Sequence, residues 1–196
     1  MILSADEVNR SLKGAVDLLH SRTEGLKAFD MSERGFWRSF AAIWLALPAY
    51  VVSIAMERLR LGLLLPDRAL FGSIWLDVAV ALGFAASFLA LPLAMIWLSR
   101  KLRRTDRYVP FVIVTNWISV MALLALSVPA LLLVIGWATP ALACLFSVAF
   151  AIIFARLQWF ATRATLGVSS GLAFCIVLLG LMLNLAIGEI MQSLIG

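Results

Sequence analysis

The chain has few of the side chains that carry out chemistry. Its 196 residues include one histidine and two cysteines, and only 14% of them are charged. His20 has no neighbouring metal ligands, and Cys144 and Cys175 both fall inside apolar runs, where cysteine behaves as a small hydrophobic residue. The sequence also lacks the common metalloprotease, serine-hydrolase, phosphate-loop and dinucleotide-binding motifs. We therefore expect no metal site, no cofactor and no catalytic centre.

Apolar side chains are abundant instead. The chain is 63% hydrophobic, with a mean hydropathy of +1.02, which lies outside the range of soluble domains. No charged residue occurs between Tyr108 and Ala155, and Gly136–Pro140 is the only turn-like interruption. A helix crosses the hydrocarbon core in about 20 residues. This stretch therefore predicts two spans joined by a short turn.

The whole chain is predicted to be an all-α, polytopic membrane bundle, because only helices satisfy the backbone in lipid over runs of this length. Residues 1–35 form a cytoplasmic amphipathic segment, and residues 36–196 form the transmembrane domain. Five spans are predicted, at residues 37–56, 75–98, 109–135, 141–160 and 165–189. The polar N-terminal segment, with charges of both signs, does not have the pattern of a signal peptide, so the first span should remain in the mature protein.

The N-terminal segment contains a helix signal. Ser4 and Glu7 have the spacing of a capping box. Apolar residues then follow at helical spacing, at Val8, Leu12, Ala15, Val16 and Leu19. This pattern predicts an amphipathic helix that lies on the inner leaflet or packs under the bundle, or else docks a partner protein.

Basic residues predict the orientation, because they accumulate on the cytoplasmic side. With five spans, one side collects the N-terminal segment and the second and fourth loops. These carry Arg10, Lys13, Arg22, Lys27, Arg34, Arg38, Arg100, Lys101, Arg103, Arg104, Arg107, Arg156 and Arg163. The other side has Arg58, Arg60 and Arg68. We therefore expect a cytoplasmic N-terminus and an external C-terminus.

The densest basic cluster is the second loop. It consists of Arg100, Lys101, Arg103, Arg104 and Arg107. Each basic residue near an anionic bilayer contributes about 1 kcal/mol of attraction. We expect these side chains to contact lipid headgroups, and the cluster is too short and too close to the bilayer to indicate nucleic-acid binding.

Polar residues at membrane depth are the first candidates for a functional site. They are Asp77, Thr115, Asn116, Ser119, Asn184 and Glu189. Small residues spaced by four predict close helix packing within the chain or between copies. These are Gly83 in the second span, and Gly167, Gly171, Gly180 and Gly188 in the fifth.

The entry to the third span resembles the bacterial branch of the Yip family (Ypt-interacting-protein-type membrane proteins). The similarity lies in Arg107-Tyr108-Val109-Pro110-Phe111 followed by Asn116-Trp117. The eukaryotic Asp-Leu-Tyr-Gly-Pro signature is missing, and Gly35-Phe36-Trp37 stands in its place. The resemblance implies a five-span protein of a bacterial inner membrane, with a periplasmic C-terminus, that organises membranes or binds partners.

Two functions follow as expectations. The first is a non-enzymatic inner-membrane protein that binds anionic lipids or a protein partner, forms homo-oligomers, or serves as an accessory subunit of a membrane complex. The second is a small transporter or channel, in which the polar residues of spans two, three and five line the path.

Overall fold

The structure is a computed structural model that describes residues 3–64 and 74–195. In this part of the chain the regular elements are all helical. They are α1 (Ala5–Leu19), η1 (Thr23–Ala28), α2 (Glu33–Ala41), η2 (Ala42–Ala46), α3 (Leu47–Leu64), α4 (Ile74–Lys101), η4 (Thr105–Arg107), α5 (Tyr108–Val134), α6 (Pro140–Leu166) and α7 (Ser170–Ile195). The elements η1, η2 and η4 are short 3₁₀ helices.

Five helical stretches are long and apolar enough to cross a membrane. They are Glu33–Gly62, Ile74–Lys101, Thr105–Val134, Pro140–Leu166 and Ser170–Leu194. This agrees with the predicted all-helical architecture and the number of spans. The first stretch is a composite, because the 3₁₀ helix η2 joins α2 to α3.

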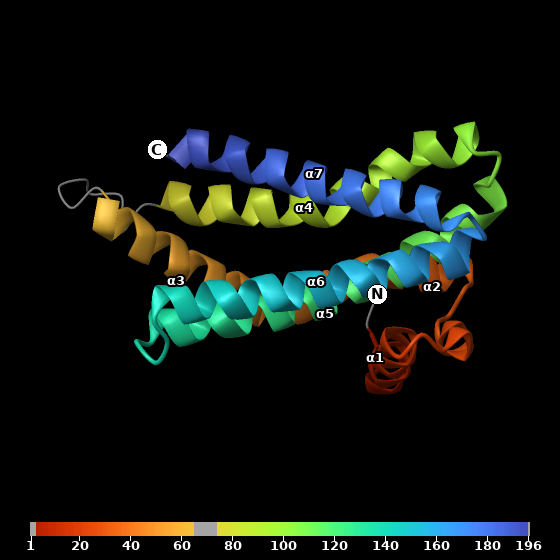
Figure 1. The fold of residues 1–196 in the computed structure, drawn as a ribbon, viewed down its shortest axis with the longest axis horizontal. Helices are drawn as coiled ribbons and strands as arrows, with labels where there is room; N and C mark the ends of the chain where they lie inside the picture. Colours follow the sequence, from red (N-terminus) through yellow and green to blue (C-terminus); the bar gives the residue numbers. More distant parts are fainter. Residues whose placement is uncertain (1–2, 65–73, 196) are drawn as a thin grey trace.

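The long helices form two pairs. Helices α5 and α6 lie side by side, and α4 and α7 form the second pair (Figure 1). The α2–η2–α3 stretch runs along α5, and α3 then approaches α4. Helix α1 packs under α5 and α6 near the end of the bundle where α2 begins, and the C-terminus lies at the opposite end (Figure 1).

Span boundaries differ most from the prediction between α6 and α7. The structure continues α6 to Leu166, closes it at Gly167 with φ 61°, and begins α7 only at Ser170. Gly167 therefore ends a helix in the left-handed conformation that glycine favours, and it is not part of a packing row within the fifth span. The apolar run crosses this turn without a charge, so the pattern gave no signal for it.

The first span also extends further than predicted. Helix α3 continues past residue 56, so Arg58 and Arg60 lie on the helix and not in a loop. Arg68 lies outside the described residues. The charged end of α3 therefore packs near α4 and contributes ion pairs to the bundle.

Helix α1 forms as predicted, and of its predicted apolar residues Ala15 is buried while Val8, Leu12 and Leu19 pack partly buried against the core. The centre of the buried face is shifted toward neighbouring small and polar residues. Ser4 caps the helix by accepting a hydrogen bond from the Glu7 backbone N–H at 3.2 Å. The buried residues are Glu7, Ser11, Gly14, Ala15 and Leu18, whereas Val16 is exposed. The small residues on this face allow close contact: a Cβ at Gly14 would lie 2.7 Å from the Gly25 carbonyl oxygen. The helix thus packs under the bundle.

The entry into α2 is held by two local contacts. Ser32 is the N-cap and accepts a hydrogen bond from the Gly35 N–H, and the Asp30 carboxylate accepts one from the Ser32 N–H. A Cβ at Gly35 would lie 1.9 Å from the Asp30 carbonyl oxygen. Glycine is therefore required where the chain turns into its first span.

Replacing Gly35 with alanine should lower the free energy of unfolding by at least about 2 kcal/mol, because overpacking against backbone forces the turn to shift. Gly188→Ala is the matched control, since nothing lies within 4 Å of a Cβ there. Alanine favours a helix, so this control should be neutral or slightly stabilising. Thermal unfolding in detergent micelles measures both variants, and equal midpoints would contradict the assigned backbone clash.

Candidate functional site

The polar residues in the first half of α5 are buried structural contacts. Asn116 is fully buried, and its Nδ2 donates a hydrogen bond to Ser39 Oγ at 3.0 Å. Ser39 in turn donates to the Phe36 carbonyl at 2.7 Å. The Asn116 Oδ1 atom is buried without a partner. Asn116 therefore ties α5 to α2 and retains one unsatisfied acceptor.

Thr115 makes a second contact of this kind. Its hydroxyl accepts a hydrogen bond from Gln158 Nε2 on α6 at 2.9 Å. Ser119, one turn further along α5, is half-buried. Thr115 and Asn116 thus connect α5 to two different neighbours, α6 and α2.

The Asn116–Ser39 contact can be measured with a double-mutant cycle. Ser39→Ala and Asn116→Ala should each destabilise the protein, and the coupling energy between them should be about 0.6–1.7 kcal/mol, as for hydrogen bonds between membrane helices. The readout is unfolding in mixed micelles. Ser193→Ala, which removes an exposed hydroxyl on α7, is the control, and additive effects of the two variants would show that the bond contributes nothing.

A groove lies between α3, α4, α5 and α7 in the other half of the bundle. It has a volume of about 340 Å³. Its polar lining consists of Ser53, Glu57, Ser87, Asn184 and Gln192. We call it the α3–α4–α7 groove. Of the predicted polar residues only Asn184 lines it; Glu57 was missed because it was assigned to a loop.

Asp77 and Glu189 occupy other positions. Asp77 accepts a hydrogen bond from Arg58 at 2.6 Å, and its backbone carbonyl accepts one from the Tyr50 hydroxyl at 3.0 Å. Glu189 is exposed on α7. The six predicted residues therefore separate into contacts near Asn116, the ion pair of Asp77, exposed Glu189 and the groove residue Asn184.

The glycines differ in a similar way. A Cβ at Gly83 would lie 2.8 Å from Met191, and one at Gly180 would lie 3.2 Å from Leu91, so both allow α4 and α7 to approach closely. Gly171 and Gly188 have nothing within 4 Å of a Cβ. Spacing by four alone did not distinguish packed glycines from open ones.

The N-terminal segment is locked to the bundle by charged contacts. Arg38 on α2 donates a hydrogen bond to the Glu7 carboxylate at 2.9 Å, and the Glu7 side chain is only 5% exposed. This tertiary ion pair takes the Glu7 side chain away from the predicted capping box. Arg156 on α6 donates to the Leu19 carbonyl and to Ser21 Oγ, just past the end of α1.

Asp30 adds a pH-sensitive contact next to this segment. The pKa of Asp30 is lowered from 3.8 mainly by its hydrogen bond with Ser32, and further by the charges of Arg38 and Arg10. A lowered pKa in the folded state means that the contact stabilises the protein fully above about pH 4–5 and is lost as the pH falls through the folded value.

We therefore expect Asp30→Asn to lower the melting temperature of the protein at pH 6–7, with a difference from wild type that shrinks below pH 4. Asp6→Asn is the control, because Asp6 is an exposed acidic residue in the first turn of α1. A difference that stays constant down to pH 3 would contradict the assigned contact. The difference in melting temperature is measured by thermal unfolding in one detergent at each pH of the series.

A second groove lies at the basic end of the bundle, where η1 meets the start of α5 and the end of α6. It also has a volume of about 340 Å³. Lys27 and Arg107 supply its positive charge, and Arg107 also lies 3.4 Å from the Asp106 carboxylate. The other lining residues are Leu26, Met31, Pro110, Ala164 and Thr165. We call it the Lys27–Arg107 groove. Arg107 was predicted to contact headgroups, whereas Lys27 comes from the N-terminal segment and only the fold brings it here.

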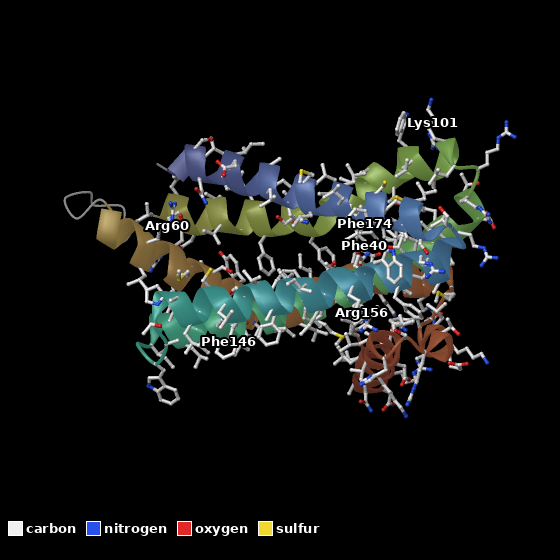
Figure 2. All side chains as sticks on the ribbon, viewed as in Figure 1. Phe40, Arg60, Lys101, Phe146, Arg156 and Phe174 are labelled. Carbon is white, nitrogen blue, oxygen red and sulfur yellow. The ribbon has the colours of Figure 1, made fainter. Side chains whose placement is uncertain are left out.

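The rest of the basic loop surrounds this end. Arg100, Lys101, Arg103 and Arg104 are exposed. Lys101 lies over the ring of Trp97 at 5.1 Å, and Arg163 lies over Trp159 at 5.0 Å. Figure 2 shows Lys101 and Arg156 toward this end and Arg60 at the other.

Comparisons with known proteins return no match: no family model, no curated protein and no solved structure is similar to the chain. The resemblance to the Yip family therefore stays a prediction. Three of the residues that carry it are buried in the fold: Asn116 contacts α2, and Phe111 and Trp117 are 1% and 2% exposed. Tyr108 donates a hydrogen bond to the Pro92 carbonyl of α4 at 3.2 Å.

Proposed function

We propose that this protein is an integral membrane protein that binds anionic lipid headgroups at its N-terminal end and acts by binding, not by catalysis. The observation that carries the proposal is the Lys27–Arg107 groove. It combines two cations from separate segments with an apolar floor. A phosphate headgroup with an attached acyl chain has the complementary chemistry.

Membrane insertion is supported by the exposure of the long helices. Only 11–33% of the most apolar window in each of the five stretches is buried within the protein. On α6, Leu145 is 64% exposed and Ile152 is 65% exposed. Apolar faces of this extent on all five helices require a cover, and lipid supplies it.

The proposed orientation places the N-terminus in the cytoplasm. At the opposite end of the bundle, Arg58 pairs with Asp77 and Arg60 pairs with Glu57. Ion pairs occur at the N-terminal end too, since Arg38 pairs with Glu7 and Arg107 with Asp106, but exposed cations are more numerous there. The asymmetry favours the cytoplasmic side for that end, and a bacterial inner membrane as the location, as the family resemblance implies.

The headgroup site can be tested with Lys27→Gln/Arg107→Gln. Loss of two cations should weaken binding of phosphatidylglycerol by about 30-fold, at about 1 kcal/mol per basic residue. Native mass spectrometry of the protein in maltoside micelles measures the retained lipid.

Lys13→Gln/Arg34→Gln is the matched control, because it removes one exposed lysine and one exposed arginine of the N-terminal segment that do not line the groove. It should weaken binding much less. Equal effects of the two double variants would mean diffuse attraction without a site, and unchanged binding in both would refute the proposed function.

A transporter is the second candidate function, and the α3–α4–α7 groove is the observation that favours it. The groove is lined by both Asn184, which is exposed, and Glu57, which is half-buried, among mostly apolar residues. In this alternative the groove would hold a substrate that enters from the C-terminal end. The path would then have to pass the buried contacts of Thr115 and Asn116.

A further inference from the structure

The polar wall of the α3–α4–α7 groove offers acceptors, and two of its side chains, Ser53 and Asn184, already use a donor within their own helices. The Ser53 hydroxyl donates to the Ala49 carbonyl at 2.9 Å, and the Asn184 Nδ2 donates to the Gly180 carbonyl at 2.9 Å. Both bonds stay within one helix. The Ser53 oxygen and the Asn184 Oδ1 therefore remain as acceptors on residues that line the groove.

Glu57 adds a negative charge to this wall. Its Oε1 atom accepts two hydrogen bonds from Arg60, which hold the carboxylate in place. Glu57 lines the groove, but Arg60 does not. The wall of the groove therefore includes the Glu57 carboxylate, while the Arg60 guanidinium that partly balances the charge of Glu57 lies outside the groove.

Apart from Ser87 and Gln192, the remaining wall is apolar. It is formed by Val80, Phe84, Leu123, Ile187 and Met191, with Gly83 and Gly188 between them. A ligand that fits this groove has hydrogen-bond donors and positive charge at one end and an apolar chain at the other. An anion would meet the carboxylate, and the groove holds too few carboxylates to enclose a divalent cation.

We infer that the α3–α4–α7 groove binds the primary ammonium headgroup of a membrane lipid, with Glu57, Ser53 and Asn184 accepting its N–H bonds. The lipid chain lies along the apolar wall. This site is at the opposite end of the bundle from the Lys27–Arg107 groove and does not depend on it.

The experiment compares phosphatidylethanolamine with phosphatidylcholine, which has the same net charge but no N–H donors. Native mass spectrometry of the full protein in maltoside micelles gives the ratio of the two dissociation constants. The wild type should bind phosphatidylethanolamine at least tenfold more tightly, which is the scale of a lost hydrogen bond to a charged group. Equal binding of the two lipids would overturn the inference.

Two variants locate the site. Glu57→Gln removes the charge, and Ser53→Ala/Asn184→Leu removes two acceptors while leaving the Glu57–Arg60 pair intact. Glu57→Gln should bring the ratio close to one, and Ser53→Ala/Asn184→Leu should lower the ratio through the loss of two acceptors. The second keeps the test valid if releasing Arg60 unfolds the first, and melting temperatures show which variants remain folded.

Ser127→Ala/Ser193→Ala is the matched control, because these hydroxyls bond within their own helices and do not line the groove. It should keep the wild-type ratio, as should Lys27→Gln/Arg107→Gln. A wild-type ratio of the two dissociation constants in both Glu57→Gln and Ser53→Ala/Asn184→Leu would overturn the inference. If Lys27→Gln/Arg107→Gln loses phosphatidylglycerol binding but keeps the wild-type ratio for phosphatidylethanolamine and phosphatidylcholine, the two sites are independent.

Discussion

The burial of α5 on all sides is the constraint on which the rest of the structure depends. Every residue from Phe111 to Ile118 is buried, and at 3.6 residues per turn this stretch covers the full circumference of the helix. A polar group in it must find a partner in another helix. Asn116 and Thr115 do so through α2 and α6, and these contacts fix how α5 is oriented in the bundle.

Close packing around one half of α5 leaves the other half of the bundle more open. Helices α2 and α6 and the N-terminal α1 all contact α5, whereas the α4–α7 pair separates from the α5–α6 pair toward the C-terminal end (Figure 1). At the open end, polar residues line a groove and do not pair across an interface. The same residue types therefore serve as structural contacts at one end and remain available to a ligand at the other.

The span count could be predicted because it depends only on long apolar runs and the charges between them. Helix ends were harder, since Gly167 is a cap and Gly83 a packing contact, yet both occur at the same spacing in apolar sequence. Glu7 matched a local capping pattern, but its side chain pairs with Arg38, a distant residue in sequence. Lys27 and Glu57 line grooves that several segments of the chain form together. A local sequence pattern does not contain contacts between distant segments, so these positions could not be predicted.

The charges at the two ends of the bundle are arranged differently, and this difference bears on how the protein would sit in a bilayer. Cations from two segments converge in the Lys27–Arg107 groove, where Arg107 also pairs with Asp106. At the other end, each described arginine of α3 has an acidic partner. Glu57 is paired with Arg60 and also lines the α3–α4–α7 groove. A carboxylate in an ion pair can therefore still be near a ligand in the groove. In the two proposals, the Lys27–Arg107 groove therefore contacts a headgroup phosphate, and the α3–α4–α7 groove contacts a headgroup ammonium.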